Sequence, residues 1–243
     1  SSGDVYALIY QEFVDFVDAN IDTLRAVHKD NPLRPLIARQ TAWSMTRFIA
    51  MMKVLHSINQ YSYLRDEAMA ENVDALVEDL YPGKKIVIWA HNFHIRHDQS
   101  GVQGDTYGGE TMGTYVAQRH RPDLYTVGLY MYRGRAAYNS RSTYVLWPPV
   151  ENSVEAIFYQ TRCKYVFVDM LGEQQDEGNA WMFGLTPVKT WGMRNLVMKP
   201  RNQYDAIVFI DTVNPPDYVD LVGVAEVPTV VLLESYVPQP MRK

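Results

Sequence analysis

The chain has 243 residues, of which 47% are hydrophobic and 21% charged, and its formal net charge at pH 7 is −5. This composition excludes a collagen-like, low-complexity or wholly disordered chain. An acidic chain gains nothing overall from contact with a phosphate backbone, so we expect no nucleic-acid partner. No apolar run approaches the ~18 residues that span a bilayer, so we expect no membrane association.

The chain contains one cysteine, Cys163, which forbids an internal disulfide and a zinc site with several cysteines. A single cysteine and the lack of a visible signal peptide fit a reducing compartment, so we expect a cytoplasmic protein. We expect Cys163 itself to be a small buried residue near the start of a strand.

The first third of the chain has the apolar spacing of helices, with apolar residues recurring every three or four positions. The sequence predicts helices over residues 6–24, 36–57 and 62–80. A Pro-Gly pair at 82–83 ends the pattern. We therefore expect an all-helical subdomain over residues 1–82.

After residue 83, short apolar runs alternate with helical patterns. We expect strands over residues 85–90, 125–130, 165–169 and 206–211, with helices over 111–119 and 153–159. This alternation favours an α/β domain over residues 83–214, with a mainly parallel sheet flanked by helices. The remaining tail, 215–243, contains an apolar run at 229–233 that could add an edge strand.

Three of the six histidines lie within residues 91–97, directly after the first predicted strand. Open α/β sheets bind their ligands at the carboxyl ends of strands, and histidine can move protons near neutral pH, orient a carboxylate or bind metal. We therefore predict that His91 and His94 are catalytic and face one cleft. Asn92 and Arg96 are candidates for orienting a substrate. The structural alternative is a surface loop in which one histidine bonds to the backbone.

A second candidate group lies on the third predicted helix, where Arg65, Met69 and Asn72 share a face. An inward arginine beside an apolar methionine is costly unless it is paired. The guanidinium of Arg65 could orient a carboxylate or an oxyanion, or it could form an ion pair that joins the helix to the sheet. We predict Arg65 and Asn72 as substrate-binding or orienting residues.

Several other chemistries lack their sequence signatures. The spacing of His91 and His94 is three, without the intervening glutamate of helical zinc sites, so we expect no metal and no cofactor. Asp98 and Glu110 could complete a metal site in space, which leaves a metal-dependent hydrolase as an alternative. The chain has neither a Gly-x-Ser-x-Gly nucleophile motif nor a phosphate-binding glycine loop.

Several strings occur in an order and spacing that resemble the erythromycin esterase family between about residue 40 and residue 214. They are RDEAMAEN at 65–72, KIVIWAHNFH at 85–94, TMGTY at 111–115, VG at 127–128, SVEA at 153–156 and YDAIVFID at 204–211. The resemblance implies an α/β domain with an inserted helical subdomain. It also implies hydrolysis of a carboxylic, macrolactone-type ester by water that a histidine activates. His91 and His94 match the paired active-site histidines of the family.

One family segment is absent from the chain. The base of the family lies in a Gly-Glu-Ala/Ser-Thr-His-Gly-like string upstream of the helical region, and this sequence contains no such string. We therefore expect a C-terminal portion of an esterase, in which a missing N-terminal half or a partner chain completes the sheet and supplies the base. His91 and His94 would position water or stabilise the oxyanion, and Arg65 would hold an acidic partner. The alternative is a non-catalytic ligand-binding or interaction module of the same fold.

Overall fold

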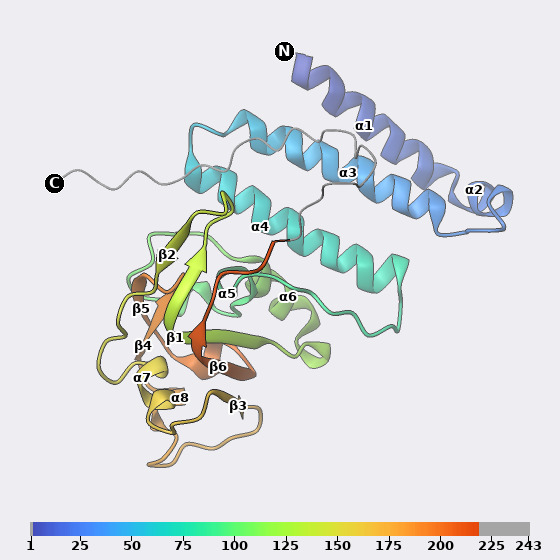
Figure 1. Ribbon diagram of the computed structural model, residues 1–243. Helices are drawn as coiled ribbons and strands as arrows, with labels where there is room; N and C mark the ends of the chain where they lie inside the picture. Colours follow the sequence, from blue (N-terminus) through green and yellow to red (C-terminus); the bar gives the residue numbers. More distant parts are fainter. Residues whose placement is uncertain (1, 219–243) are drawn as a thin grey trace.

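The computed structural model describes residues 2–218 and places a layer of N-terminal helices against a mixed sheet (Figure 1). The helices are α1 (Ser2–Ala19), α2 (Ile21–Val27), α3 (Arg34–Lys53) and α4 (Ile58–Asp74), which continues as a π-helical turn over Ala75–Leu80. Helix α4 lies between α3 and the rest of the molecule and packs against α6 (Figure 1). Residues of α4 can therefore reach both the helical layer and the site near the sheet.

The helical layer differs from the sequence prediction in the middle of the first helix and at the start of α4. The first predicted helix is divided at Asn20 into α1 and α2. Helix α4 begins at Ile58, four residues earlier than predicted, because the Ser57 hydroxyl caps it by accepting from the Gln60 N–H at 3.4 Å.

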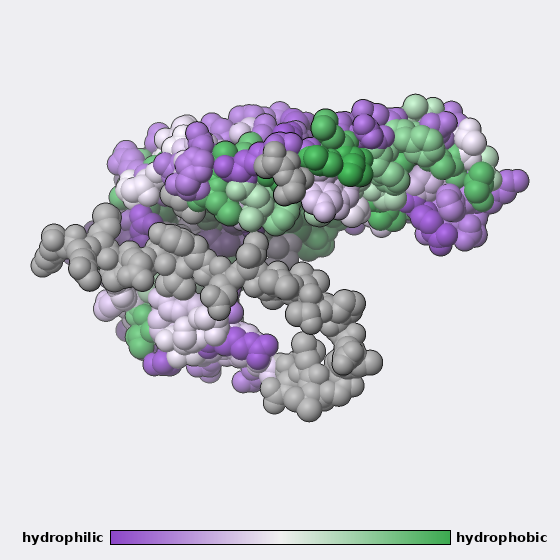
Figure 2. Space-filling view, turned by 90° about the horizontal axis from the view of Figure 1, so that it is seen from above, coloured by the Kyte–Doolittle hydropathy of each residue, from purple (hydrophilic) through white to green (hydrophobic). Residues whose placement is uncertain are grey.

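Helix α1 has two apolar faces. Val14 and Val17 are buried. On another face Ile9 and Phe16 are 52% and 55% exposed. Figure 2, which looks onto the helical part, shows green apolar patches among purple polar ones there.

The described residues form two sheets. The larger contains β1 (Val127–Ala137), β2 (Thr143–Val145), β3 (Tyr165–Asp169) and β6 (Ala206–Val213) in the order β2-β1-β6-β3. The smaller is a hairpin of β4 (Thr186–Thr190) and β5 (Arg194–Met198), which the sequence did not predict. The α/β class is confirmed, but the expectation of a mainly parallel sheet is wrong. Among strands of residues 2–218, only β1 and β6 pair in parallel. An apolar run indicates burial and carries no information about strand direction.

The remaining helices are short. They are α5 (Asn92–Ile95), α6 (Met112–His120), α7 (Val154–Tyr159), α8 (Ala180–Phe183) and α9 (Pro200–Gln203), with 3₁₀ turns at Gln99–Gly101 and Arg121–Asp123. Helices α6 and α7 confirm two predictions, and each begins after a side-chain cap. The Thr111 hydroxyl accepts from the Thr114 N–H, and the Ser153 hydroxyl accepts from the Ala156 N–H.

The first predicted strand, residues 85–90, is not a strand. This segment has no regular secondary structure and pairs with no strand within residues 2–218. Val87 is 91% exposed and Trp89 is 86% exposed. The apolar pattern is typical of a buried strand, but the described part of the chain provides no neighbour to pair with it.

Three further observations concern Cys163, the tail and membrane-spanning helices. Cys163 is exposed rather than buried. The possible edge strand at residues 229–233 lies outside the described residues. Within residues 2–218, no helix combines the length and the apolar character that crossing a bilayer requires.

The main core joins the sheets to α7 and α8. It contains Val102, Tyr130, Val154, Phe158, Met170, Met182, Val188, Leu196, Met198, Tyr204, Ile207 and Phe209. Because β1, α7 and the β4–β5 hairpin all enter this core, it fixes the wall of the cavity described below.

Candidate active site around His91 and His94

Helix α5, which includes His94, is fixed to the sheet by a side-chain amide. Asn92 Nδ2 donates to the Leu129 carbonyl at 2.7 Å, and the Leu129 N–H donates to Asn92 Oδ1 at 2.8 Å. On its other side α5 meets α6, where a Cβ on Gly113 would lie 2.3 Å from the carbonyl carbon of Ile95. Only glycine allows this approach. In the structure Asn92 positions α5, and it also lines the cavity described below, so its role in orienting a substrate stays a prediction.

His94 lies between the carboxylate of Asp66 and the guanidinium group of Arg65. Its Nδ1 is 2.7 Å from Asp66 Oδ1, and its Nε2 is 3.1 Å from Arg65 Nη1. An arginine can only donate, so Nε2 must be the unprotonated nitrogen. The proton is therefore assigned to Nδ1, which donates it to Asp66, and the imidazole is neutral in this arrangement.

Asp66 is almost fully buried, at 1% exposure. Its Oδ1 also accepts from the Met112 N–H at 2.9 Å, at the start of α6, where a negative charge is favourable. Its Oδ2 accepts a longer bond, 3.4 Å, from the Tyr107 hydroxyl. Burial and the Asp66 charge both raise the pKa of Tyr107, so this hydroxyl stays protonated as a donor. Asp66 thus links α4, α5 and α6 while it orients His94.

His91 has a different environment. Its Nδ1 accepts from the Phe93 N–H at 3.2 Å and so caps α5, and its ring lies 5.3 Å from the Trp191 ring. Although the residue as a whole is exposed, burial of its imidazole, with smaller contributions from His94 and Arg96, lowers the pKa of His91 to about 4. Near pH 7 His91 is therefore neutral, and because Nδ1 accepts, Nε2 carries the hydrogen. His91 can donate a hydrogen bond but is a poor base.

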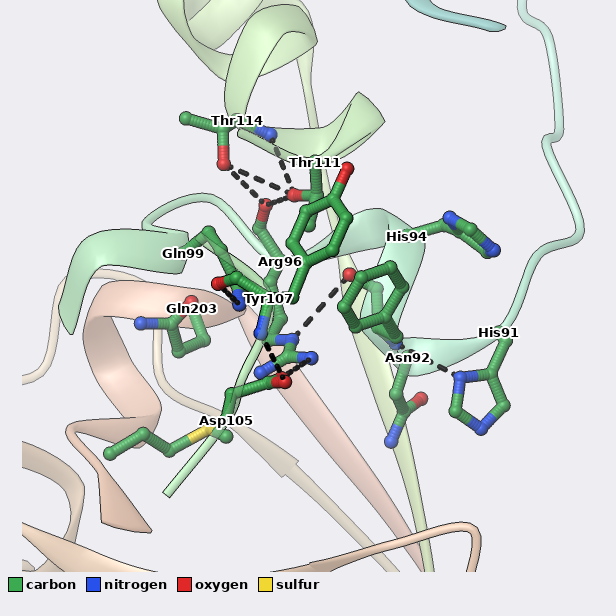
Figure 3. A network of polar contacts seen from close by, with 12 residues as sticks. His91, Asn92, His94, Arg96, Gln99, Asp105, Tyr107, Thr111, Thr114 and Gln203 are labelled. Carbon is green, nitrogen blue, oxygen red and sulfur yellow. Dashed lines mark hydrogen bonds and ion pairs between the residues drawn. The ribbon is translucent and has the colours of Figure 1, made fainter. Parts of the chain in front are cut away.

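His91 lines a cavity of about 430 Å³, and His94 does not. The walls come from the segment before α5, from β1, from α7 and from the β4–β5 turn. They are Trp89, Ala90, His91, Asn92, Leu129, Tyr130, Met131, Glu155, Lys189, Thr190, Trp191 and Gly192. His91 and His94 do not share this cavity, and the prediction that both face one cleft stays a prediction. Figure 3 shows the two rings apart at the edge of the polar network.

Two buried charged residues belong to the cavity wall. Glu155 is 0% exposed, and its Oε1 accepts from the backbone N–H of Lys189 at 2.7 Å. The Lys189 ammonium donates to the carbonyls of Tyr132 and Trp147, each at 2.9 Å. Burial raises the pKa of Glu155 and lowers the pKa of Lys189. Glu155 Oε2 has no hydrogen-bond partner among residues 2–218.

The turn between β4 and β5 is strained. Trp191 and Gly192 have φ of +58° and +67°, and the Met193 N–H donates to the Thr190 carbonyl at 3.2 Å. Positive φ at both central residues defines a type I′ turn, which prefers Asn-Gly. A tryptophan in this conformation costs about 1–2 kcal/mol.

Two predicted site residues serve the framework. Arg96 is 1% exposed, pairs with Asp105 at 3.1 Å and stacks over Phe93, inside the network of Figure 3. Asn72 Oδ1 accepts from Gln40 and Ser44 on α3, so it joins two helices and does not reach His94. Of the residues predicted to touch substrate, only Arg65 contacts a histidine of the pair.

No metal centre stands out in the structure. Residues 2–218 contain no group of three or more histidine, cysteine, aspartate or glutamate side chains that could hold a metal ion. Asp98 caps a 3₁₀ turn by accepting from the Gly101 N–H. The possible partnership of Asp98 and Glu110 with the histidines is therefore not formed.

Fold and site together define an α/β protein with a histidine pair beside a helical layer. The sequence model of the erythromycin esterase family matches residues 7–213, and the chain belongs to this family. A curated relative from Bacillus subtilis (strain 168), named "Putative hydrolase YbfO", is 32% identical over 165 residues. That match covers 65% of this chain and 37% of the relative.

Three solved structures share the fold. A Bacillus cereus protein has a TM-score of 0.70 at 18% sequence identity. A succinoglycan biosynthesis protein has a TM-score of 0.64, also at 18% identity. A histidine-to-asparagine mutant of erythromycin esterase EreC, in its open conformation, has 0.55 at 17%. These matches cover 89%, 88% and 86% of this chain but only 53%, 52% and 53% of those chains. The chain thus spans about half the length of the structures it resembles.

Sequence reasoning missed several site residues. Asp66 had a usable signal, because it precedes Ala70 and Val73 on the buried face of α4, where a lone acid needs a partner. Glu155 had none, because an acid in the first turn of a helix is ordinary. Its contact with Lys189 joins residues 34 positions apart and can be found only from the fold.

Proposed function

We propose that this chain provides the histidine-bearing part of a carboxylic ester hydrolase that uses water as the nucleophile, with macrolactone-type esters as the substrate class. The hydrogen-bonded chain Asp66–His94–Arg65 is the observation on which the proposal chiefly rests. A buried carboxylate that fixes one imidazole tautomer is a common arrangement in hydrolytic sites. The family and the hydrolase-like relative support the same reaction class.

In the proposed reaction, the oxygen of water adds to the ester carbonyl carbon while a base takes its proton. The resulting oxyanion accepts a hydrogen bond from His91 Nε2–H, which a neutral imidazole can donate. The bond from the carbonyl carbon to the leaving oxygen then breaks, and the alkoxide takes the proton that the base removed from water. The carboxylic acid formed releases its own proton to solvent. The products are a carboxylate and an alcohol.

Neither histidine is free to act as the base in the described arrangement. His91 uses Nδ1 to accept from Phe93, and His94 Nε2 accepts from Arg65. We propose that a segment outside this chain supplies the base, with an acidic group that Arg65 holds. The exposed Val87 and Trp89 support a related proposal, that this segment or a partner chain pairs with residues 85–90.

The test compares the chain of 243 residues with the polypeptide that its whole gene encodes. We expect the whole polypeptide to hydrolyse p-nitrophenyl butyrate and to open erythromycin, and the 243-residue chain to do neither. In the whole polypeptide, His94→Gln should lower kcat/KM by about 10²–10⁴, because His94 positions Arg65, which we propose holds the acidic group beside the base. His56→Gln is the control, because His56 is exposed and lies between α3 and α4. Full activity of His94→Gln would refute the role of His94. Lactone opening by the 243-residue chain alone would refute the proposal that the base comes from outside it.

A second candidate is a non-catalytic ligand-binding module. The occupied Nε2 of His94 favours it, because Arg65 already takes the lone pair that a base would use. Under this alternative the whole polypeptide binds an ester but does not hydrolyse it. Binding of p-nitrophenyl butyrate at equilibrium without release of p-nitrophenol would favour the binding module over the hydrolase.

A further inference from the structure

Trp191 stands at the strained turn between β4 and β5, and the residue is 53% exposed. Its φ of +58° is a conformation that favours glycine or asparagine. The pair Asn-Gly would form the same turn with less strain, so the turn itself does not explain a tryptophan. Strained residues that their surroundings fix tend to occur at functional sites.

The surroundings of Trp191 hold its backbone in place. Tyr144 Oη donates to the Trp191 carbonyl at 3.0 Å, and the Trp147 N–H donates to the Gly192 carbonyl at 2.8 Å. The side chain of Trp191 lines the cavity beside His91, and the centroids of the two rings are 5.3 Å apart. The fixed turn thus keeps the indole next to the histidine that we propose as the donor to the oxyanion.

A ligand in this cavity can reach both rings. His91 and Trp191 are exposed, and Leu129 and Met131, which also line the cavity, are half-buried and apolar. The volume of about 430 Å³ is in the range of small-molecule sites, which combine apolar walls with a few polar groups. The cavity therefore offers an apolar surface close to one hydrogen-bond donor, His91 Nε2–H.

The closeness of the two rings limits which part of an ester can contact the indole. A carbonyl oxygen that accepts from His91 Nε2–H lies about 2.9 Å from that nitrogen. Because the ring centroids are only 5.3 Å apart, a group that rests on the indole must lie within a few bonds of the same carbonyl.

We propose that Trp191 is a specificity-determining residue, which selects esters that carry an apolar ring or branched group close to the carbonyl. The indole contacts this group while His91 Nε2–H binds the carbonyl oxygen. The inference rests on the proposed function, and it adds the part of the substrate that the cavity recognises.

The first test measures binding and needs no turnover. The probes are N,N-dimethylacetamide and N,N-dimethyl-cyclohexylacetamide, which have the acceptor carbonyl of an ester but resist hydrolysis. They are titrated into the 243-residue chain labelled with ¹⁵N. We expect the cyclohexyl amide to shift the Trp191 indole and His91 imidazole resonances saturably, with a Kd about tenfold or more below that of dimethylacetamide. Equal Kd values, or no saturable shift at these two residues, would overturn the proposal.

Variants separate a role in binding from a role in the turn. Trp191→Asn, which suits a type I′ turn, should reduce the preference for the cyclohexyl amide to about onefold, and Trp191→Phe should retain most of it. Trp147→Asn is the matched control and should keep the preference, because Trp147 is 57% exposed and is not among the described residues that line the cavity. An unchanged preference in Trp191→Asn would contradict the proposal. If that variant did not fold, the titration of the unmodified chain would still decide.

The second test uses the whole polypeptide with ethyl acetate and ethyl cyclohexylacetate, followed by proton release. We expect Trp191→Asn to lower the ratio of kcat/KM for the cyclohexyl ester to that for the acetate about tenfold, mainly through KM. If both esters are hydrolysed and the ratio is unchanged, only the role of Trp191 fails. If neither ester is hydrolysed, the proposed hydrolysis fails, and the amide titration alone decides whether Trp191 binds the apolar group.

Discussion

Residues 85–90 and strand β6 have similar apolar sequences but opposite environments. Strand β6 pairs with β1 on one side and β3 on the other, and Ile207 and Phe209 are 0% exposed. Residues 85–90 pair with no strand among those described, and their Val87 and Trp89 face solvent. The comparison teaches that an apolar run predicts the capacity to be a buried strand, whereas its neighbours decide whether the strand forms.

The largest expected effect tests the buried member of this comparison. Phe209→Ala removes a ring that packs against Phe158 with centroids 5.6 Å apart. We expect the free energy of unfolding to fall by about 3–5 kcal/mol, measured by urea denaturation. Phe167→Ala, on the neighbouring strand β3, is the control and should cost much less, because Phe167 is 59% exposed. Equal losses in the two variants would break the comparison.

The next prediction concerns how the exposed run is anchored at its carboxyl end. Gly113→Ala places a Cβ against the backbone of Ile95, which cannot yield as a flexible side chain could. We expect a loss of about 1–3 kcal/mol in the free energy of unfolding and a shift of the His94 resonances. Gly178→Ala is the control, because its Cβ would meet only Asp176 Oδ1 at 3.4 Å. A Tm unchanged by Gly113→Ala would mean that α5 and α6 are not held in this close contact.

A smaller effect is expected from pH, at the residue that follows the exposed run. The pKa of His91 is about 4 in the folded chain and about 6.5 when unfolded, so the unfolded chain binds more protons between these values. Stability should therefore fall as the pH drops from 6.5 towards 4. His91→Asn, which can still cap α5, should reduce the slope of Tm against pH between 5.0 and 6.5. The exposed His56→Asn should retain the slope, and an equal slope in all three proteins would contradict the prediction.

The smallest effect is expected at the exposed run itself. Trp89→Ala should change the free energy of unfolding of the 243-residue chain by less than about 0.5 kcal/mol, because the ring is 86% exposed. In the whole polypeptide, where we propose that another segment covers this run, the same substitution should cost about 3–5 kcal/mol. A negligible cost in both proteins would show that residues 85–90 remain uncovered.

Local signals explain which elements could be predicted. Helices α6 and α7 were predicted from helical patterns, which Thr111 and Ser153 cap in the structure, and β3 and β6 from their apolar runs, although Phe167 of β3 is 59% exposed. The β4–β5 hairpin was missed because Pro187 interrupts the first strand pattern and Trp191 stands where a type I′ turn usually has asparagine.

The candidate site was predictable only in part. The strings at 65–72 and 85–94 identified Arg65 and the two histidines as candidates. In the structure, Arg65 hydrogen-bonds to His94. Asp66 and Glu155 were not assigned roles, because a buried acid is recognised by its partners, and these come from distant segments. Asn72 and Arg96 bond to framework residues in the structure, because polar side chains in a motif can serve packing as well as substrate, and their predicted roles toward a substrate stay predictions.

The amide of Asn92 bonds to both the N–H and the carbonyl of Leu129, the same pair of bonds that a neighbouring antiparallel strand would exchange with it. Asn92 thus acts as a substitute peptide group at the edge of β1. Both bonds are made to main-chain atoms of residue 129. A different side chain at this position would therefore leave the orientation of the turn that contains the histidines unchanged. The Leu129 side chain, which lines the cavity, can therefore be replaced to suit a different ligand without changing the orientation of His91.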